Sequence, residues 1–140
     1  MKKSIILCSL VLCFIVVGLA QKKSAINRSC SVVCLDDSWI PESYNAGAKN
    51  AIVLNAKGKI SVHETNDVSD KSDYNRADFI EFKIAIFKKK FDSMVSFSDN
   101  TYTTVDAQKV LQQCETGDQI VIILKDADKF SLPHHRIDVL

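Results

Sequence analysis

The chain contains few of the residues that form flexible or phosphate-binding loops. Four glycines and two prolines occur in 140 residues, and only Gly47, Gly58 and Gly117 follow Gly18. A glycine-rich phosphate loop and the G-x-S-x-G turn of hydrolases both need closely spaced glycines, and the sequence contains neither. It also has no internal repeat and no low-complexity tract. The common nucleotide-binding and serine-hydrolase signatures are therefore absent.

An excess of charge of one sign is missing as well. Lysine and arginine number 18 against 17 acidic residues, which gives a formal net charge of +1. A nearly neutral chain has no electrostatic footprint for nucleic acid or anionic lipid. The only cluster of like charge is Lys88-Lys89-Lys90, and such a run is typical of a solvated turn or strand end. We therefore expect no nucleic-acid partner.

Candidate catalytic groups are scarce. The only histidines are His63, His134 and His135. His134 and His135 beside Asp138 could ligate a metal, but adjacent residues of a strand point to opposite faces, so the two rings should diverge. Cys34 with a histidine could form a nucleophile–base pair, although nothing in the spacing supports it. We predict no catalytic residue, no cofactor and no metal site, and hence a non-enzymatic protein.

The N-terminus has the three parts of a secretory signal peptide in order. Lys2 and Lys3 form the positive segment, and an apolar run from Ile5 to Val17 follows. Gly18 and Ala20 supply the small residues that signal peptidase requires. The apolar run, about 13 to 16 residues, is shorter than the roughly 20 that span a bilayer as a helix. The sequence predicts that the first twenty residues are a cleavable signal peptide.

Cleavage after Ala20 would leave a mature chain from Gln21 to Leu140. Losing the two signal lysines takes the net charge from +1 to −1. The mature length suits one domain with a single core. We expect an exported protein, periplasmic or extracellular, with no membrane insertion after signal cleavage.

Three cysteines follow the signal peptide: Cys30, Cys34 and Cys114. An oxidising compartment permits one disulfide among them. If the segment from Cys30 to Cys34 is extended, its Cα atoms lie roughly 13 Å apart, whereas a disulfide needs them within about 7 Å. A pair between these two requires a turned segment, and a strand would leave one of them to reach Cys114. Cys114 on an apolar helix face also fits a small core residue, and the pairing stays open.

The mature chain divides into a loop-rich leader over 21–50 and a β domain over 51–140. Within the leader, the apolar run 30–35 fits a buried strand or one helical turn. Residues 51–55 and 59–64 flank Ala56-Lys57-Gly58, which predicts a hairpin. The polar stretch 65–78 that follows predicts an exposed loop.

The strongest strand signal in the chain lies between Phe79 and Phe87. Alternation places four residues on one face (Ile80, Phe82, Ile84 and Ile86) and Glu81 and Lys83 on the other, together with Phe79, Ala85 and Phe87. Residues 94–97 predict a short partner strand. An amphipathic helix over about 104–115, capped by Thr103 or Thr104, a central strand over 119–124 and a final strand over 137–140 complete a small antiparallel β domain.

Several elements of the C-terminal half follow one another in a recognisable order. An alternating strand ends in basic residues, a short strand and a polar turn follow, a helix closes in Gly-Asp, and two strands end the chain. These are, in order, Phe82–Lys89, Val95–Phe97, Asp99-Asn100, Asp106–Cys114, Gly117-Asp118, Ile120–Leu124 and Leu132–Val139. The stretch from Phe79 to Leu140 thereby resembles the last domain of the gliding-motility protein M family, a periplasmic component of type IX secretion.

The resemblance implies an immunoglobulin-like antiparallel β-sandwich with one short α-helix, used as a protein-binding or assembly module. It implies no motor role, because this chain has a cleavable signal where the family protein has a membrane-spanning helix. It also supplies no catalytic residue. The alternative functions are a small secreted enzyme or enzyme inhibitor, with its site at 65–78 or around His134, and a structural envelope protein.

For a binding module we expect a site along an exposed strand edge, where a protein partner or a second copy can add a strand. Polar residues at alternate positions indicate two such edges. One is the hairpin arm 59–64, and the other is the final strand, with Arg136, Asp138 and Val139 as the interaction residues.

Overall fold

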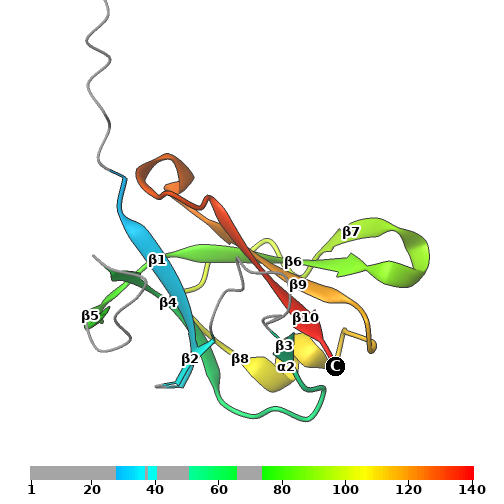
Figure 1. The fold of residues 1–140 in the computed structure, drawn as a ribbon. Coiled ribbons are helices and arrows are strands. Elements are labelled where there is room, and N and C mark those ends of the chain that lie inside the picture. Colours follow the sequence, from blue (N-terminus) through cyan, green and yellow to red (C-terminus); the bar gives the residue numbers. More distant parts are fainter. Residues whose placement is uncertain (1–27, 37, 41–50, 66–73) are drawn as a thin grey trace, which may run out of the picture.

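A computed structural model describes residues 28–36, 38–40, 51–65 and 74–140. The predicted signal peptide, the start of the leader, most of its loop and residues 66–73 lie outside these ranges. The described chain is mainly β, with two sheets and a single short α-helix (Figure 1). None of its helices combines the length and the apolar character that crossing a bilayer requires. The predicted fold class, a small β-sandwich with one short helix, is confirmed.

The first sheet is built around β4. Its strand order is β2-β1-β4-β5, and β8 pairs with β4 beside β5, all antiparallel. The strands are β1 (Cys30–Leu35), β2 (Ser38–Ile40), β4 (Lys59–Thr65), β5 (Tyr74–Phe79) and β8 (Thr104–Asp106).

The second sheet has the order β3-β10-β9-β6-β7. Its strands are β3 (Ala51–Ile52), β6 (Phe82–Lys88), β7 (Ser93–Ser96), β9 (Gln119–Leu124) and β10 (His134–Val139). All pairs are antiparallel except that of β3 with β10. The β6–β7 hairpin extends away from the rest of the sheet (Figure 1). Its tip is the 3-10 turn η1 (Lys89–Phe91), and a second turn, η2 (Ala127–Lys129), lies between β9 and β10.

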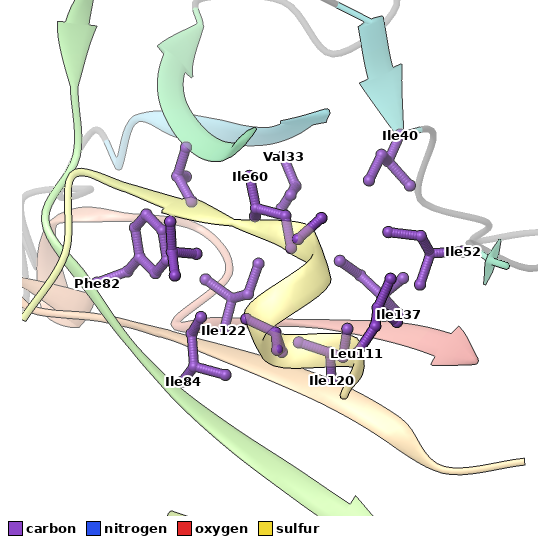
Figure 2. Packing of buried hydrophobic residues seen from close by; sticks show 14 of the residues in the cluster. Val33, Ile40, Ile52, Ile60, Phe82, Ile84, Leu111, Ile120, Ile122 and Ile137 are labelled. Carbon is purple, nitrogen blue, oxygen red and sulfur yellow. The ribbon is translucent and has the colours of Figure 1, made fainter. Parts of the chain in front are cut away.

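The core lies between the two sheets (Figure 2). Period-two alternation places one face of each strand inward, so that Val33 and Ile60 of the first sheet meet Phe82 and Ile122 of the second. The helix α2 (Ala107–Leu111) adds Val110 and Leu111. Further buried members are Ile40, Ile52, Val62, Ile84, Val105, Ala107, Ile120, Leu124, Phe130, Ile137 and Val139.

The predicted hairpin of 51–55 with 59–64 is wrong. Ala51 and Ile52 pair with β10 in the second sheet, whereas β4 lies in the first. The chain crosses between sheets at Gly58, which has φ of +122°. A Cβ there would lie 2.5 Å from Oδ2 of Asp36, and the same carboxylate accepts a hydrogen bond from the Lys59 amide at 2.8 Å. The glycine therefore serves a crossing between layers, which looks like a hairpin turn in the sequence.

Two other element boundaries differ from the predictions. The run 30–35 is strand β1 in the first sheet, so the sandwich includes strands from the segment expected to be a leader. The helix is five residues long, because Thr104–Asp106 pairs with β4 instead of joining it. Asp106, and not Thr103 or Thr104, caps the helix by accepting from the Gln108 amide at 2.9 Å.

The strongest predicted strand, residues 79–87, belongs to two strands in different sheets. Phe79 ends β5 in the first sheet, and β6 begins at Phe82 in the second. From that point the face assignment is confirmed for Ile84, which is 2% exposed, and for Lys83, which points outward. The predicted loop 65–78 likewise contains a strand, because Tyr74 to Asp78 belong to β5.

Candidate interaction edge

The first predicted edge, residues 59–64, is an interior strand. β4 pairs with β1 along one side and with β5 and β8 along the other. The polar residues of its alternation are buried: Ser61 and His63 are each 4% exposed and share a hydrogen bond of 2.9 Å. The edge assignment of this strand is wrong, because its polar alternation reflects a buried hydrogen-bonded pair and not solvent.

The second predicted edge, the final strand, is covered by β3 at two of its three predicted interaction residues. β3 pairs with β10 at Asp138 and Val139. The Val139 amide donates to the Asp118 carbonyl at 2.9 Å, and its carbonyl accepts from the Gly117 amide at 2.8 Å. Asp138 accepts from the Gln119 side chain at 2.7 Å. Arg136 is exposed and lies beyond the two residues that β3 pairs. The Val139 backbone is thus part of the ladder and offers no edge donor.

β7 is an edge strand of the second sheet. All four of its residues are exposed, and among the described strands only β6 pairs with it. Met94 is 51% exposed and Val95 48%. The strand Ser-Met-Val-Ser carries neither charge nor proline, the devices that usually protect an edge. We call Ser93–Ser96 with its outward backbone the β7 edge.

The direction of the β7 backbone groups follows from the ladder. The Phe97 amide donates to the Ile84 carbonyl at 3.0 Å, so residue 97 faces β6. Because antiparallel strands alternate inward and outward groups, Val95 also faces β6, and the amides and carbonyls of Met94 and Ser96 point away from it. Met94 lies opposite Phe87, and Val95 lies opposite Ile86.

Groups of opposite charge flank the β7 edge. At one end, η1 carries Lys89, Lys90 and Phe91, with the Phe91 side chain 68% exposed and the Lys90 ammonium 5.5 Å from its ring centroid. At the other end, the exposed Asp99 lies in a turn that Ser98 holds, since its hydroxyl contacts that of Tyr102 at 2.6 Å and accepts from the Asn100 amide at 3.2 Å. The exposed Asp92 ends the first turn and offsets one of its lysine charges, so the edge runs between a turn of net positive charge and an acidic one.

The turn end of the hairpin is fixed by the buried carboxylate of Asp118. This carboxylate is bonded to the Lys88 ammonium at 2.8 Å, the Lys89 amide at 3.1 Å and the Glu115 amide at 2.8 Å. Burial alone would raise the pKa of Asp118, but these donors hold it below its usual value. The same pair raises the pKa of Lys88, which also donates to the Gln113 carbonyl. The hairpin that carries the β7 edge is thus held to the rest of the domain.

The histidines that the sequence singled out do not converge. His134 is exposed and His135 is 2% exposed, so adjacent residues diverge as expected. The His135 ring nitrogen Nε2 is 2.8 Å from the Ser31 hydroxyl, a contact that joins the two sheets. Within the described ranges no group of three or more potential ligands could hold a metal ion.

The Cys34–histidine pair considered from the sequence is brought together but enclosed. Cys34 lies opposite Ser61 in the ladder, and His63 lies two residues further on the same face. Cys34 is fully buried, and the His63 ring packs on Phe79 with centroids 4.8 Å apart. Solvent does not reach the thiol, and the arrangement packs the outer side of the first sheet.

No disulfide joins the three cysteines of the described ranges. Cys30 and Cys34 lie on one strand, which separates them beyond disulfide distance. Cys114 packs against the core and donates to the Val110 carbonyl at 3.4 Å. Burial raises its pKa to about 11, although the nearby Lys88 lowers it in part. Cys114 therefore occupies the place of a small core residue.

We expect the His135 imidazole to make stability fall at acid pH. Burial lowers its pKa from 6.5 to about 4, so the unfolded chain binds the proton more readily. The stabilisation is complete above about pH 6.5 and is lost as the pH falls toward 4, by up to about 3 kcal/mol. Urea unfolding between pH 7.5 and 4.5 measures it.

Two variants control this pH dependence. His135→Gln should reduce the fall in unfolding free energy by about 2–3 kcal/mol, whereas His134→Gln at the exposed neighbour should leave it unchanged. Parallel pH profiles for the wild type and His135→Gln would contradict the assignment to this ring.

No family model, no curated protein and no solved structure matches this chain. The resemblance to the gliding-motility protein M family stays a prediction from the sequence. The candidate site is therefore the β7 edge as its own geometry defines it.

Proposed function

We propose that this chain is an exported, non-enzymatic protein-binding module that receives an extended segment of a partner along the β7 edge. The observation that carries the proposal is a strand with four exposed residues and no charge or proline, whose outer side no described strand occupies. The signal-like N-terminus and the family resemblance of the C-terminal half support the export and the binding role.

The chemistry of such binding is backbone pairing. The amides and carbonyls of Met94 and Ser96 can form up to four hydrogen bonds with an added strand, each worth about 0.5–1.5 kcal/mol net. The Met94 and Val95 side chains lie on opposite faces and would contact alternate residues of the guest. An extended segment with apolar residues at alternate positions therefore fits best.

The anchored turn end of the hairpin favours this role. Asp118 ties β6 and η1 to the turn before β9 through two hydrogen bonds, and a third, from the Glu115 amide, closes that turn. An edge already held in its binding conformation loses little conformational entropy on association. Most of the free energy of the backbone hydrogen bonds then contributes to the binding affinity.

A library of linear peptides tests the proposal directly. We expect peptides selected on the folded protein to bind Met94→Pro at least about tenfold more weakly, because proline removes one outward amide without touching the β6 ladder. Isothermal titration measures the affinities, and circular dichroism verifies that the variant is folded.

The matched control is Met94→Ala, which keeps the outward amide and shortens the side chain. It should bind more tightly than the proline variant. If selected peptides bind wild type and Met94→Pro equally, the edge is not their site and the proposed function is wrong.

A further inference from the structure

We propose that the segment received by the β7 edge is the β7 edge of a second copy, antiparallel, about a twofold axis at Val95. This inference rests on the proposed function, since it names the partner of the same edge. The pairing would join two five-stranded sheets into one continuous sheet.

The register follows from the outward groups. Hydrogen-bonded pairs across a new antiparallel ladder must use residues whose amides point outward, and in β7 these are Met94 and Ser96. Pairing Met94 of each copy with Ser96 of the other uses the outward amide and the outward carbonyl of both residues in each copy. A register centred on Met94 or on Ser96 would extend the ladder to Asp92 or Ser98. Asp92 has φ of +47° and does not continue the strand, and the Ser98 carbonyl already accepts from the Ser96 hydroxyl at 3.0 Å. The register centred on Val95 therefore makes the fullest use of the strand.

The side chains fit this register. Val95 of one copy lies directly opposite Val95 of the other in a non-hydrogen-bonded pair, where side chains approach most closely. Both are β-branched and half exposed, at 48%, so their contact removes apolar surface from water. Met94 lies beside Ser96 of the second copy on the opposite face. No like charges meet within the paired residues.

The flanking turns are complementary in net charge, because Lys89 and Lys90 outweigh Asp92 in one and Asp99 is the charged residue of the other. The register brings the Lys89–Phe91 turn of one copy alongside the Ser98–Asn100 turn of the other. Lys90 and Asp99 of the second copy then lie at the same end of the paired strands, and the twofold axis repeats this arrangement. A guest strand of arbitrary sequence would leave these two charged turns unmatched. The charge pattern of the chain itself therefore favours a second copy.

The contact is small, because only four residues per copy pair. Interfaces of this size are typical of weak and reversible association. We expect a dimer that forms at chain concentrations of about 10–100 μM and weakens as salt screens the Lys90–Asp99 pairs.

Sedimentation equilibrium of the purified mature chain between 5 μM and 1 mM (both approximate) tests the proposal. Met94→Pro should weaken the dimer at least about tenfold, and Met94→Ala should weaken it less. Lys90→Asp and Asp99→Lys should each weaken it several-fold. The double variant Lys90→Asp with Asp99→Lys should restore the wild-type dissociation constant, because the charge pairs re-form in reverse.

Two results would overturn the proposal. One is a wild type that stays monomeric at the highest concentration, and the other is a dimer that Met94→Pro and the charge swaps leave unchanged. The peptide selection separates this failure from that of the proposed function: a monomer that still binds peptides through Met94 keeps the edge as a site for a different protein.

Discussion

Replacing Ile84 with aspartate is expected to leave the chain largely unfolded at room temperature. Ile84 is 2% exposed and lies opposite Ile122 within the core (Figure 2). The variant loses the burial of an isoleucine and places a carboxylate where the core offers no partner, at a combined cost of about 5 kcal/mol or more. The total stability of a domain of this size is only about 5–15 kcal/mol.

The neighbouring Lys83→Asp is the matched control. Lys83 points to solvent from the same strand, so the same aspartate should change the unfolding free energy by no more than about 0.5 kcal/mol. Thermal unfolding followed by circular dichroism measures both variants. Similar melting temperatures would mean that the two faces of β6 have been assigned wrongly.

The second large effect is expected for Asp118→Ala, with a loss of about 3–5 kcal/mol. The substitution leaves the Lys88 ammonium and the amides of Lys89 and Glu115 without their shared acceptor. The turn end of the β6–β7 hairpin should loosen first. Faster amide exchange at residues 89 and 115 would accompany the fall in unfolding free energy.

Asp126→Ala tests whether the loss of stability expected for Asp118→Ala depends on the burial of its ion pair. Asp126 bonds Lys129 at 2.7 Å, a distance similar to that of the Lys88–Asp118 pair. Both side chains of the Asp126–Lys129 pair, however, are exposed. Exposed pairs contribute little to stability, so this variant should unfold like the wild type. Equal losses for the two aspartates would show that the Asp118 network contributes no more than a surface pair.

The sequence predicts which residues are buried better than it predicts which strands pair. The strands at Phe82–Lys88, Ser93–Ser96 and Gln119–Leu124 appear close to where the sequence predicts them, the first from its alternation and the last from its continuous apolar run. Alternation reports the two faces of a strand, however, and contains no information on its neighbour. Ala51–Ile52 and Lys59–Thr65 therefore looked like one hairpin although they belong to different sheets.

The same limit explains why the sequence placed the interaction edge on the wrong strands. Alternating polar residues predicted edges at β4 and β10, but Ser61 and His63 are buried together and β3 covers Val139. The β7 edge was visible only as a short partner strand, because its exposure depends on its being last in the sheet. A cue was nevertheless present in the sequence, since Ser93–Ser96 is a strand without charge or proline.

The strand connections also determine how quickly the chain can fold. β3 pairs with β10, β4 pairs with β8, and the amide of Ser29 bonds the carbonyl of Lys129, so much of the structure joins residues distant in sequence. Chains dominated by such contacts fold on the millisecond-to-second scale, because each long loop must close before its contacts stabilise it. At about 5–20 residues per second, the synthesis of 140 residues takes longer than such folding. For a protein exported as proposed here, the topology of the native state would therefore not by itself keep the precursor unfolded until it is translocated.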